Sequence, residues 1–371
     1  MDREFDIKTL KENLQGGLSG YRPRPFWSWN DDLKKEELLR QIDQMKEKGI
    51  GGFFMHARGG LKTEYLSKEW FDCIRACTER AKELGMEAWG YDENGWPSGF
   101  AGMKLLEDSA NHEQYLVRKV GDFDPSANAS YLVKDGKCVR VSESKGEGEY
   151  INVYVKTNPS VVDVMNPAIV RKFIDLTHER YKKELGDDFG KYMLGFFTDE
   201  PQYYRWETPY SPCLAERMKK EYGVDLWEEL GKLFCDAEGS KRFRYLYWNC
   251  AHKQFIESFI KQIYDWCNEN GCRITGHDIE ESRLFTQMWC CGGLMDFYEY
   301  EHIPGMDWLG RNVGDELAPK QLGSSAEQLG KKLAITETFA CCGWDVTPGE
   351  LKKLVDGQFV NGVNQICQHL M

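Results

Sequence analysis

The chain has 371 residues, of which 41% are hydrophobic and 29% are charged, and these proportions indicate a globular protein with a sizeable core. Its formal net charge of −12 argues against a nucleic-acid or anionic-membrane partner, because both would repel an acidic protein. The charged N-terminus is unlike a signal peptide and no apolar run is long enough to span a bilayer, so we expect a cytoplasmic protein with reduced thiols at its thirteen cysteines.

The N-terminal part of the chain predicts strands that alternate with helices. A short amphipathic helix over 5–14 comes first. Strands are then expected over 24–30, 50–56 and 86–91. The helix before the third strand begins at Ser67, a good N-cap residue, and ends at Gly85, a good C-cap residue.

Residues from about 112 to 160 break this alternation. Their period-two hydrophobicity and their turn signals, such as Asp135-Gly136, predict a small β insertion after the third strand. A helix restarts at Asn166-Pro167, a favourable cap-then-proline pair. Five further strands are predicted over 192–197, 272–277, 293–298, 333–339 and 363–369.

Eight strands, most of them preceded by a helix, predict an α/β fold of the (β/α)₈ TIM barrel class with the small insertion after strand three. No glycine-rich phosphate loop follows the first strand, which argues against a dinucleotide-binding doubly wound sheet. We expect residues 1–371 to form one catalytic barrel domain that carries the insertion at about 112–160.

Polar side chains, most of them acidic, follow the predicted strands, and barrels of this class place their active site at those carboxyl ends. The fourth strand ends in Asp199 and Glu200, and the seventh ends in Glu337. Buried carboxylates are costly unless they are paired or used. We predict Glu200 and Glu337 as catalytic, and we predict substrate contacts for Trp29, Asn30, His56, Arg58, Asp92, Glu93, Asp199, His277, Asp278, Trp344 and His369.

Two carboxyl groups across a sugar-sized gap suit glycoside hydrolysis, in which one protonates the leaving oxygen and the other activates water or attacks the anomeric carbon. Asp199 beside Glu200 would raise the pKa of one member. Tryptophans at strand ends favour stacking on a sugar, and the excess of carboxylates favours a neutral one. The rings expected around the pocket are Trp27, Trp29, Trp96 and Trp344, with Trp206 and Trp308 at further strand ends.

Several motifs together resemble glycoside hydrolase family 106 and its relatives. They are Arg24-Pro-Phe-Trp-Ser-Trp-Asn30, Gly49-Ile-Gly-Gly-Phe-Phe53, Tyr91-Asp-Glu-Asn-Gly-Trp-Pro97, Phe196-Phe-Thr-Asp-Glu-Pro201 and Thr336-Glu-Thr-Phe339 with Gly343-Trp344. The resemblance implies an inverting α-L-rhamnosidase with calcium (Ca²⁺) near the sugar hydroxyls. By position it implies that Glu200 and Glu337 are the catalytic pair, and that Glu301 is a metal-side or substrate-contacting carboxylate. Asp92, Glu93, Glu299 and Glu301 supply oxygen ligands that suit calcium, and we predict Glu301 and Glu299 as its ligands. The family carries β domains beyond its barrel, and we do not expect them within residues 1–371.

The leading prediction is an exo-acting glycoside hydrolase for α-L-rhamnosides or related sugars. Three alternatives stay open at this point: a retaining barrel β-glycosidase, a non-catalytic carbohydrate-binding relative, and a metal-dependent barrel isomerase. The residues do not decide which glutamate is the acid, whether the anomeric configuration is retained, or the oligomeric state.

Overall fold

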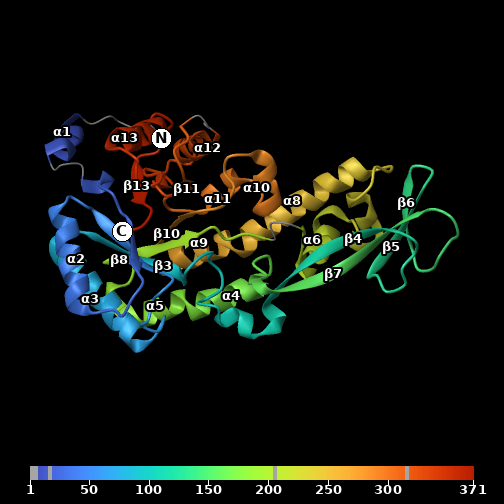
Figure 1. Ribbon diagram of the computed structural model, residues 1–371, viewed down its shortest axis with the longest axis horizontal. Helices are drawn as coiled ribbons and strands as arrows, with labels where there is room; N and C mark the ends of the chain where they lie inside the picture. The colour runs from blue at the N-terminus through green and yellow to red at the C-terminus, as the bar shows by residue number, and fades with distance from the viewer. Residues whose placement is uncertain (1–6, 16–18, 204–206, 314–316) are drawn as a thin grey trace.

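The computed structural model describes residues 7–15, 19–203, 207–313 and 317–371. Its eight parallel strands are β1 (Phe26–Trp29), β2 (Gly52–Ala57), β3 (Glu87–Asn94), β8 (Met193–Asp199), β10 (Arg273–His277), β11 (Gly305–Trp308), β12 (Ile335–Thr338) and β13 (Gln365–Gln368). They form a five-stranded sheet of order β1-β2-β3-β8-β10 and a three-stranded sheet of order β11-β12-β13 (Figure 1).

The two parallel sheets curl toward each other at both edges. On one side, the Met371 N–H donates to the carbonyl of Phe26 at 2.8 Å, and the Arg24 N–H donates to the carbonyl of Ile366 at 2.9 Å. On the other side, Thr275 and Ile303 form an isolated parallel bridge. These contacts place β13 beside β1 and the approach to β11 beside β10, although the regular ladders of the described residues remain two sheets.

Helices precede most of the strands and cover the outer faces of the sheets. Their ends follow the capping rules: the Ser67 hydroxyl accepts the Trp70 N–H at 3.1 Å, and Thr347 forms a capping box with Glu350. The α-helices on this part of the chain are α1 (Ile7–Gln15), α2 (Lys35–Glu47), α3 (Lys68–Leu84), α4 (Pro167–Leu176), α5 (His178–Leu185), α9 (Ile260–Glu269), α10 (Leu284–Cys290), α11 (Leu294–Glu299), α12 (Leu317–Gln328) and α13 (Pro348–Phe359). Short 3₁₀ helices cover Ser19–Tyr21, Lys104–Glu107, Ser109–Asn111, Gly186–Asp188 and Leu230–Leu233.

An antiparallel sheet projects from the parallel sheets and forms an elongated extension of the molecule (Figure 1). Its strands are β4 (His112–Gly121), β5 (Ala129–Lys134), β6 (Lys137–Val141), β7 (Glu149–Val162) and β9 (Thr208–Tyr210), in the order β6-β5-β7-β4-β9. Strands were predicted over about 112–160, but β9 joins from outside that range. Three helices complete the extension: α6 (Pro212–Tyr222), α7 (Leu226–Glu229) and α8 (Ser240–Ser258).

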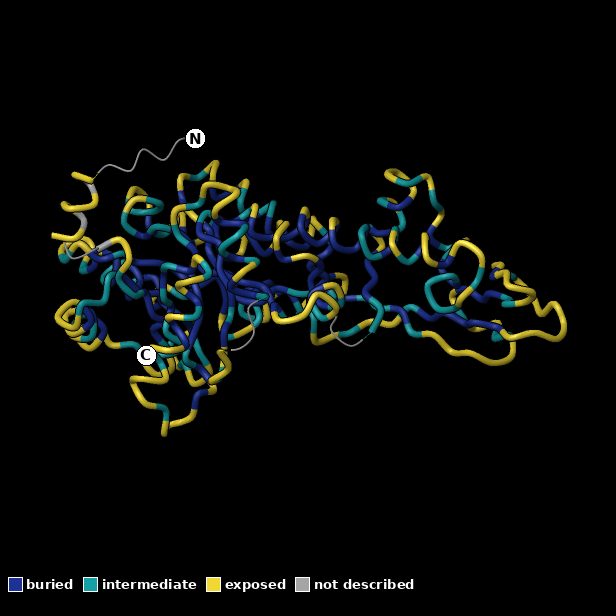
Figure 2. Tube along the Cα trace, turned by 90° about the horizontal axis from the view of Figure 1, so that it is seen from above, coloured by how far each residue is buried: buried dark blue, intermediate teal, exposed yellow. Residues whose placement is uncertain are grey.

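Aromatic side chains fill the space that the parallel strands enclose. Phe26 and Phe197 meet edge to face with their ring centroids 4.6 Å apart, and Tyr91 packs against both. Figure 2 shows buried residues concentrated inside the molecule, whereas exposed residues lie around its outside and at the far end of the extension. None of the helices in the described segments is long and apolar enough to cross a lipid bilayer.

The sixth strand predicted over 293–298 is wrong. Residues 294–299 form α11, whose buried residues Leu294, Phe297 and Tyr298 follow the i, i+3, i+4 spacing of a helix face. The sixth strand is β11, which begins at Gly305. Among the other sequence predictions, Phe5 and Trp206 lie outside the described residues.

Candidate active site

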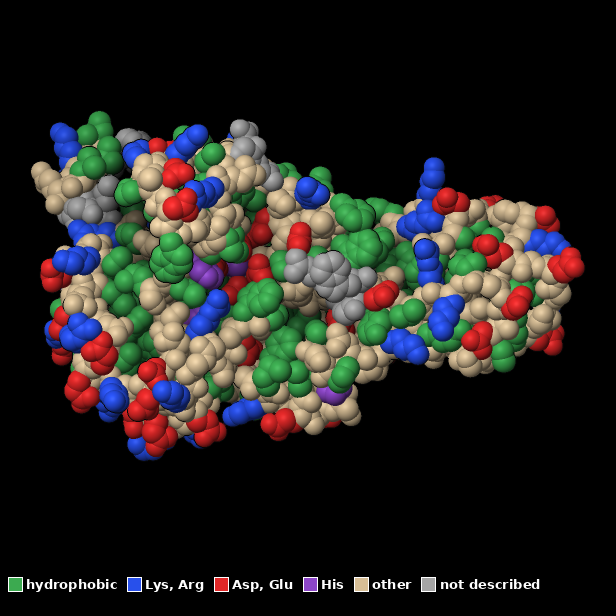
Figure 3. Space-filling model, in the orientation of Figure 1, with side chains coloured by type: hydrophobic (Ala, Val, Ile, Leu, Met, Phe, Trp, Pro, Cys, Tyr) green, Lys and Arg blue, Asp and Glu red, His purple; other side chains and the backbone are tan. Residues whose placement is uncertain are grey.

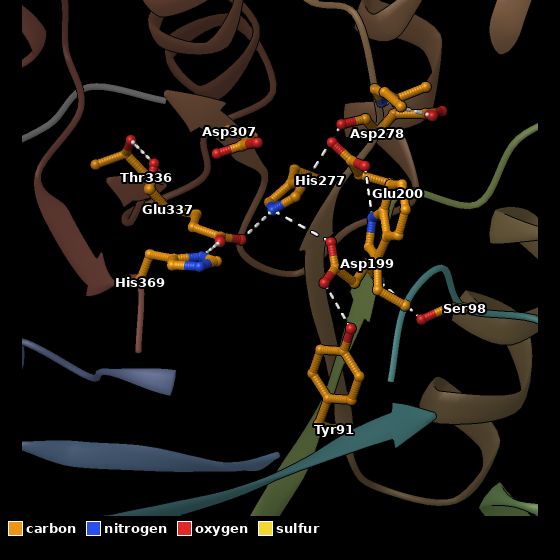
Figure 4. Close-up of polar contacts among 12 residues, drawn as sticks. Tyr91, Ser98, Asp199, Glu200, His277, Asp278, Asp307, Thr336, Glu337 and His369 are labelled. Carbon is orange, nitrogen blue, oxygen red and sulfur yellow. Dashed lines mark hydrogen bonds and ion pairs between the residues drawn. The ribbon is translucent and has the colours of Figure 1, made fainter. Parts of the chain in front are cut away.

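Strand register brings four polar side chains together at the carboxyl ends of the parallel strands. The β8–β10 ladder pairs Asp199 with His277, and the β11–β12 ladder pairs Asp307 with Glu337. Directly paired residues on neighbouring strands point to the same face of a sheet. The curl of the two sheets therefore turns both pairs toward one site, which Figure 4 shows.

A continuous series of polar contacts runs through this site. Nε2 of His277 lies 2.7 Å from Oε2 of Glu337 and 3.6 Å from Oδ1 of Asp199. The Tyr91 hydroxyl donates to Oδ2 of Asp199 at 2.5 Å, and Nδ1 of His369 contacts Oε1 of Glu337. The carboxyl groups of Asp199 and Glu337 are both almost completely buried. We call this series, from Tyr91 to His369, the carboxyl–imidazole cluster.

The cluster holds Glu337 ionised. Burial alone would raise the pKa of Glu337, but its hydrogen bonds with His277 and His369 outweigh burial and lower the pKa to about 2. Burial alone would lower the pKa of His277, but Glu337 and Asp199 raise it well above its usual value. Glu337 and His277 are therefore a buried ion pair at neutral pH.

Glu200 is held in the opposite state. Burial and the neighbouring charge of Asp199 raise its pKa to about 9, so its carboxyl group keeps a proton at neutral pH. Nε1 of Trp96 donates to Oε2 of Glu200 at 2.5 Å. The backbone of Glu200 has φ 46°, a left-handed conformation that is strained for a residue with a side chain. Figure 4 shows its carboxyl group and that of Glu337 on either side of His277.

A cavity of about 360 Å³ opens beside Glu200. Glu281 and Asp307 line it, and Oε1 of Glu281 accepts the Asp307 N–H at 2.8 Å. Burial raises the pKa of Glu281 to about 7 and raises that of Asp307 as well. Sequence reasoning missed both residues. A correct sixth strand would have placed Asp307 beside Glu337, whereas no pattern in the sequence singles out Glu281.

Two predicted substrate contacts lie beside the cluster. The His56 ring stacks on Tyr91 with the ring centroids 3.6 Å apart, and Nη1 of Arg58 lies 3.5 Å from Nε2 of His56. Burial, followed by the charge of Arg58, lowers the pKa of His56 to about 3, so its ring is neutral. His56 and Arg58 thus flank the cluster from the β2 side.

Three other predicted contacts are occupied inside the protein. The Glu93 carboxyl group accepts the backbone N–H groups of Phe100 and Ala101 at 2.7 and 2.8 Å, and also that of Gly102. Asp92 accepts the Ser98 hydroxyl at 2.6 Å. Oδ1 of the completely buried Asp278 accepts the N–H of Ile279 at 2.8 Å. Asp92 and Glu93 thereby hold the loop after β3 that presents Trp96.

The remaining predicted contacts are Trp29, Asn30 and Trp344. The Trp29 ring is buried and meets Trp27 and Trp70 edge to face, so it offers no face to a sugar. Asn30 is exposed in the loop after β1. The Trp344 side chain is fully exposed. A position at a strand end does not show whether neighbouring side chains cover a ring, as they cover that of Trp29.

The predicted metal ligands do not come together. Glu299 is exposed at the end of α11, and Glu301 is completely buried before β11. Within the described segments, only Asp199, His277 and Glu337 form a group of at least three possible ligands, with donor atoms within 4.8 Å of one another. Calcium takes six to eight oxygen ligands, and His277 offers a nitrogen already bonded to Glu337. These residues therefore do not form a calcium shell as they stand.

No model of a known protein family matches the chain, and no curated protein matches it. A solved rhamnosidase from Novosphingobium sp. PP1Y is similar in structure, with a TM-score of 0.73 and 16% sequence identity; the likeness covers 98% of this chain and 56% of that one. This chain thus spans little more than half of that rhamnosidase. The likeness shows a glycoside hydrolase-like fold.

Two other solved structures are much less similar. A putative α-L-fucosidase of Bacteroides thetaiotaomicron VPI-5482 has a TM-score of 0.42 and 7% identity, over 94% of this chain and 88% of that one. An O-GlcNAc hydrolase of Thermobaculum terrenum has a TM-score of 0.40 and 8% identity, over 94% and 56%. Neither likeness is close enough to support a conclusion about this chain.

Proposed function

We propose that the protein is a glycoside hydrolase that removes terminal α-L-rhamnosyl or related sugars, with Glu200 as the general acid and Glu337 as the base. One observation carries this proposal: two strand-end carboxyl groups in one site are held in opposite protonation states at neutral pH. Glycoside hydrolysis needs one carboxyl group that gives a proton and another that is ionised.

Glu200 is suited to the first step. Its carboxyl proton passes to the glycosidic oxygen as the bond between that oxygen and the anomeric carbon breaks, and the bonding electrons leave with the oxygen. Trp96 fixes the other carboxyl oxygen through its Nε1 hydrogen bond, which orients the acid. The alcohol then departs as a neutral molecule, and Glu200 is left ionised.

Glu337 is suited to the second step. As an ionised carboxylate it takes a proton from water while the water oxygen attacks the anomeric carbon. His277 and His369 hold both of its oxygens and keep its pKa low. Tyr91 holds Asp199, the other carboxyl group near His277, in place. The family resemblance supports this inverting course, and the anomeric configuration of the first product, observed by NMR, tests it.

We propose further that the eight parallel strands form one closed (β/α)₈ barrel. Support comes from the hydrogen bonds between β1 and the end of the chain, and from the Thr275–Ile303 bridge at the other edge. These are the two edges at which such a barrel would close.

We also propose the calcium ion that the resemblance implies, and none of the steps above depends on it.

A panel of aryl glycosides at neutral pH tests the substrate proposal. Faster release of the aglycone from the α-L-rhamnoside than from any other glycoside would support it. A preference for the β-glucoside would favour a retaining β-glycosidase. Cleavage of a glucuronide would contradict the neutral-sugar argument, in which Arg58 is the arginine that we place beside the cluster among the described residues. Binding of sugar without any cleavage would identify a non-catalytic carbohydrate-binding protein.

A further inference from the structure

The cavity beside Glu200 touches only one of the two proposed catalytic groups. Glu200 forms part of its wall, whereas Glu337 and its histidine partners do not. In a glycosidase the general acid faces the leaving group, and the base faces the opposite side of the sugar ring. A space that borders the acid and not the base therefore lies on the leaving-group side of the site.

The wall of this cavity combines apolar and acidic side chains. Its only described lining residues with apolar side chains are Trp96, Ile279, Trp308, Leu309 and Ala318. Trp96 is 51% exposed and Leu309 is 42% exposed, so both present apolar surface to solvent at the cavity. Figure 3 shows acidic and histidine side chains gathered in a hollow of this face, with hydrophobic side chains around it.

The described lining residues of the cavity include several carboxyl groups. The acidic members are Glu200, Glu280, Glu281 and Asp307. An apolar leaving group removes the exposed surface of Trp96 and Leu309 from water, which favours its binding in this cavity.

We propose that this cavity is the subsite for the leaving alcohol, and that it selects an aromatic or other apolar aglycone over a polar sugar. This inference rests on the proposed function, because it takes Glu200 as the group that protonates the leaving oxygen. The aglycone lies against the exposed Trp96 ring next to Glu200, and Leu309 covers its outer part.

Two glycosides of the preferred sugar test the proposal: the 2-phenylethyl glycoside and the 2-hydroxyethyl glycoside. Both release primary alcohols, so their comparison reports mainly binding in the cavity. We expect kcat/KM to be at least about tenfold higher for the phenylethyl glycoside, because one phenyl ring is buried. Leu309→Asn should reduce this preference to about threefold or less. The matched control is Leu329→Asn beyond the end of α12, where the leucine is 43% exposed, and it should keep the full preference.

Direct binding of 2-phenylethanol, with ethylene glycol as the comparison, separates this proposal from the proposed reaction. We expect saturable quenching of tryptophan fluorescence by 2-phenylethanol, with at least about fivefold weaker binding in Leu309→Asn. Hydrolysis without any apolar preference, or binding that Leu309→Asn leaves unchanged, would overturn the aglycone subsite while the hydrolase stands. Binding that depends on Leu309 without cleavage of either glycoside would support the apolar cavity and overturn the hydrolase.

Discussion

Replacing Glu200 by glutamine should raise stability and remove activity, and both effects follow from the buried, protonated carboxyl group. The pKa of Glu200 is raised from 4.5 to about 9, first by burial and then by Asp199. An acid whose pKa is higher in the folded state contributes its full stability below pH 4.5 and loses it as pH rises toward 9. Each pH unit in this window removes about 1.4 kcal/mol, so about 3 kcal/mol is lost by pH 7.

Urea unfolding of the wild type and Glu200→Gln at pH 5 and pH 7 measures this loss. The advantage of the variant in free energy of unfolding should grow by about 3 kcal/mol between the two pH values, since glutamine does not titrate. Its kcat should fall at least about a hundredfold. Glu149→Gln, at an exposed position on β7, is the control and should change neither quantity. An advantage that is equal at both pH values would refute the assignment of Glu200 as a buried, protonated acid.

Three further predictions concern the rest of the site. His277→Gln should shift the acidic limb of the kcat/KM–pH profile to higher pH by at least about one unit. Burial then raises the pKa of Glu337, and only the hydrogen bond with His369 still lowers it. An acidic limb at the same pH as in the wild type would contradict the ion pair of His277 and Glu337. Glu93→Gln should lower the free energy of unfolding, measured in urea, by about 2–4 kcal/mol. The reason is that an amide nitrogen would replace a carboxyl oxygen that accepts backbone N–H groups. Unchanged stability together with weakened sugar binding would instead identify Glu93 as a substrate contact. Exhaustive chelation tests the calcium that the family resemblance implies: Asp199, His277 and Glu337 form no calcium shell as they stand, so the hydrolysis rate should stay unchanged, whereas a loss of rate that added calcium restores would support the proposed ion.

Much of the strand pattern could be predicted because local sequence determines it. Apolar runs that end in polar residues marked the strands that carry Asp199, His277 and Glu337, and parallel strands bring such ends to one edge. The pairing of Asp199 with His277 depends on register, which the sequence does not show. The protonation state of each carboxyl group depends on that pairing, so the sequence alone does not assign Glu200 as the acid.

Where the structure differs from the sequence predictions, the cause is again a contact that the local sequence does not show. Residues 293–298 satisfy both a strand and a helix pattern over so short a length, and contacts with the rest of the protein select the helix. Trp29 sits at a strand end as expected, but Trp70 on α3 covers its ring. Glu93 ends a strand as well, yet the following loop folds back and uses its oxygens. In each case, a contact with a residue outside the local sequence pattern decides the role of the residue.

The antiparallel extension also bears on how the chain folds. The ladder between β3 and β8 must close a segment of about a hundred residues, and loop-closure entropy increases with segment length. The antiparallel ladder of β4 and β7 forms from contacts nearer in sequence, and it ends where the Asp163 N–H meets the carbonyl of Asn111 at 2.9 Å. Once this ladder is formed, the free segment is roughly half as long, which reduces the closure penalty by about 0.6 kcal/mol. The β4–β7 ladder can thus form before β8 is synthesised, and it shortens the search by which β8, which ends at Asp199, finds β3.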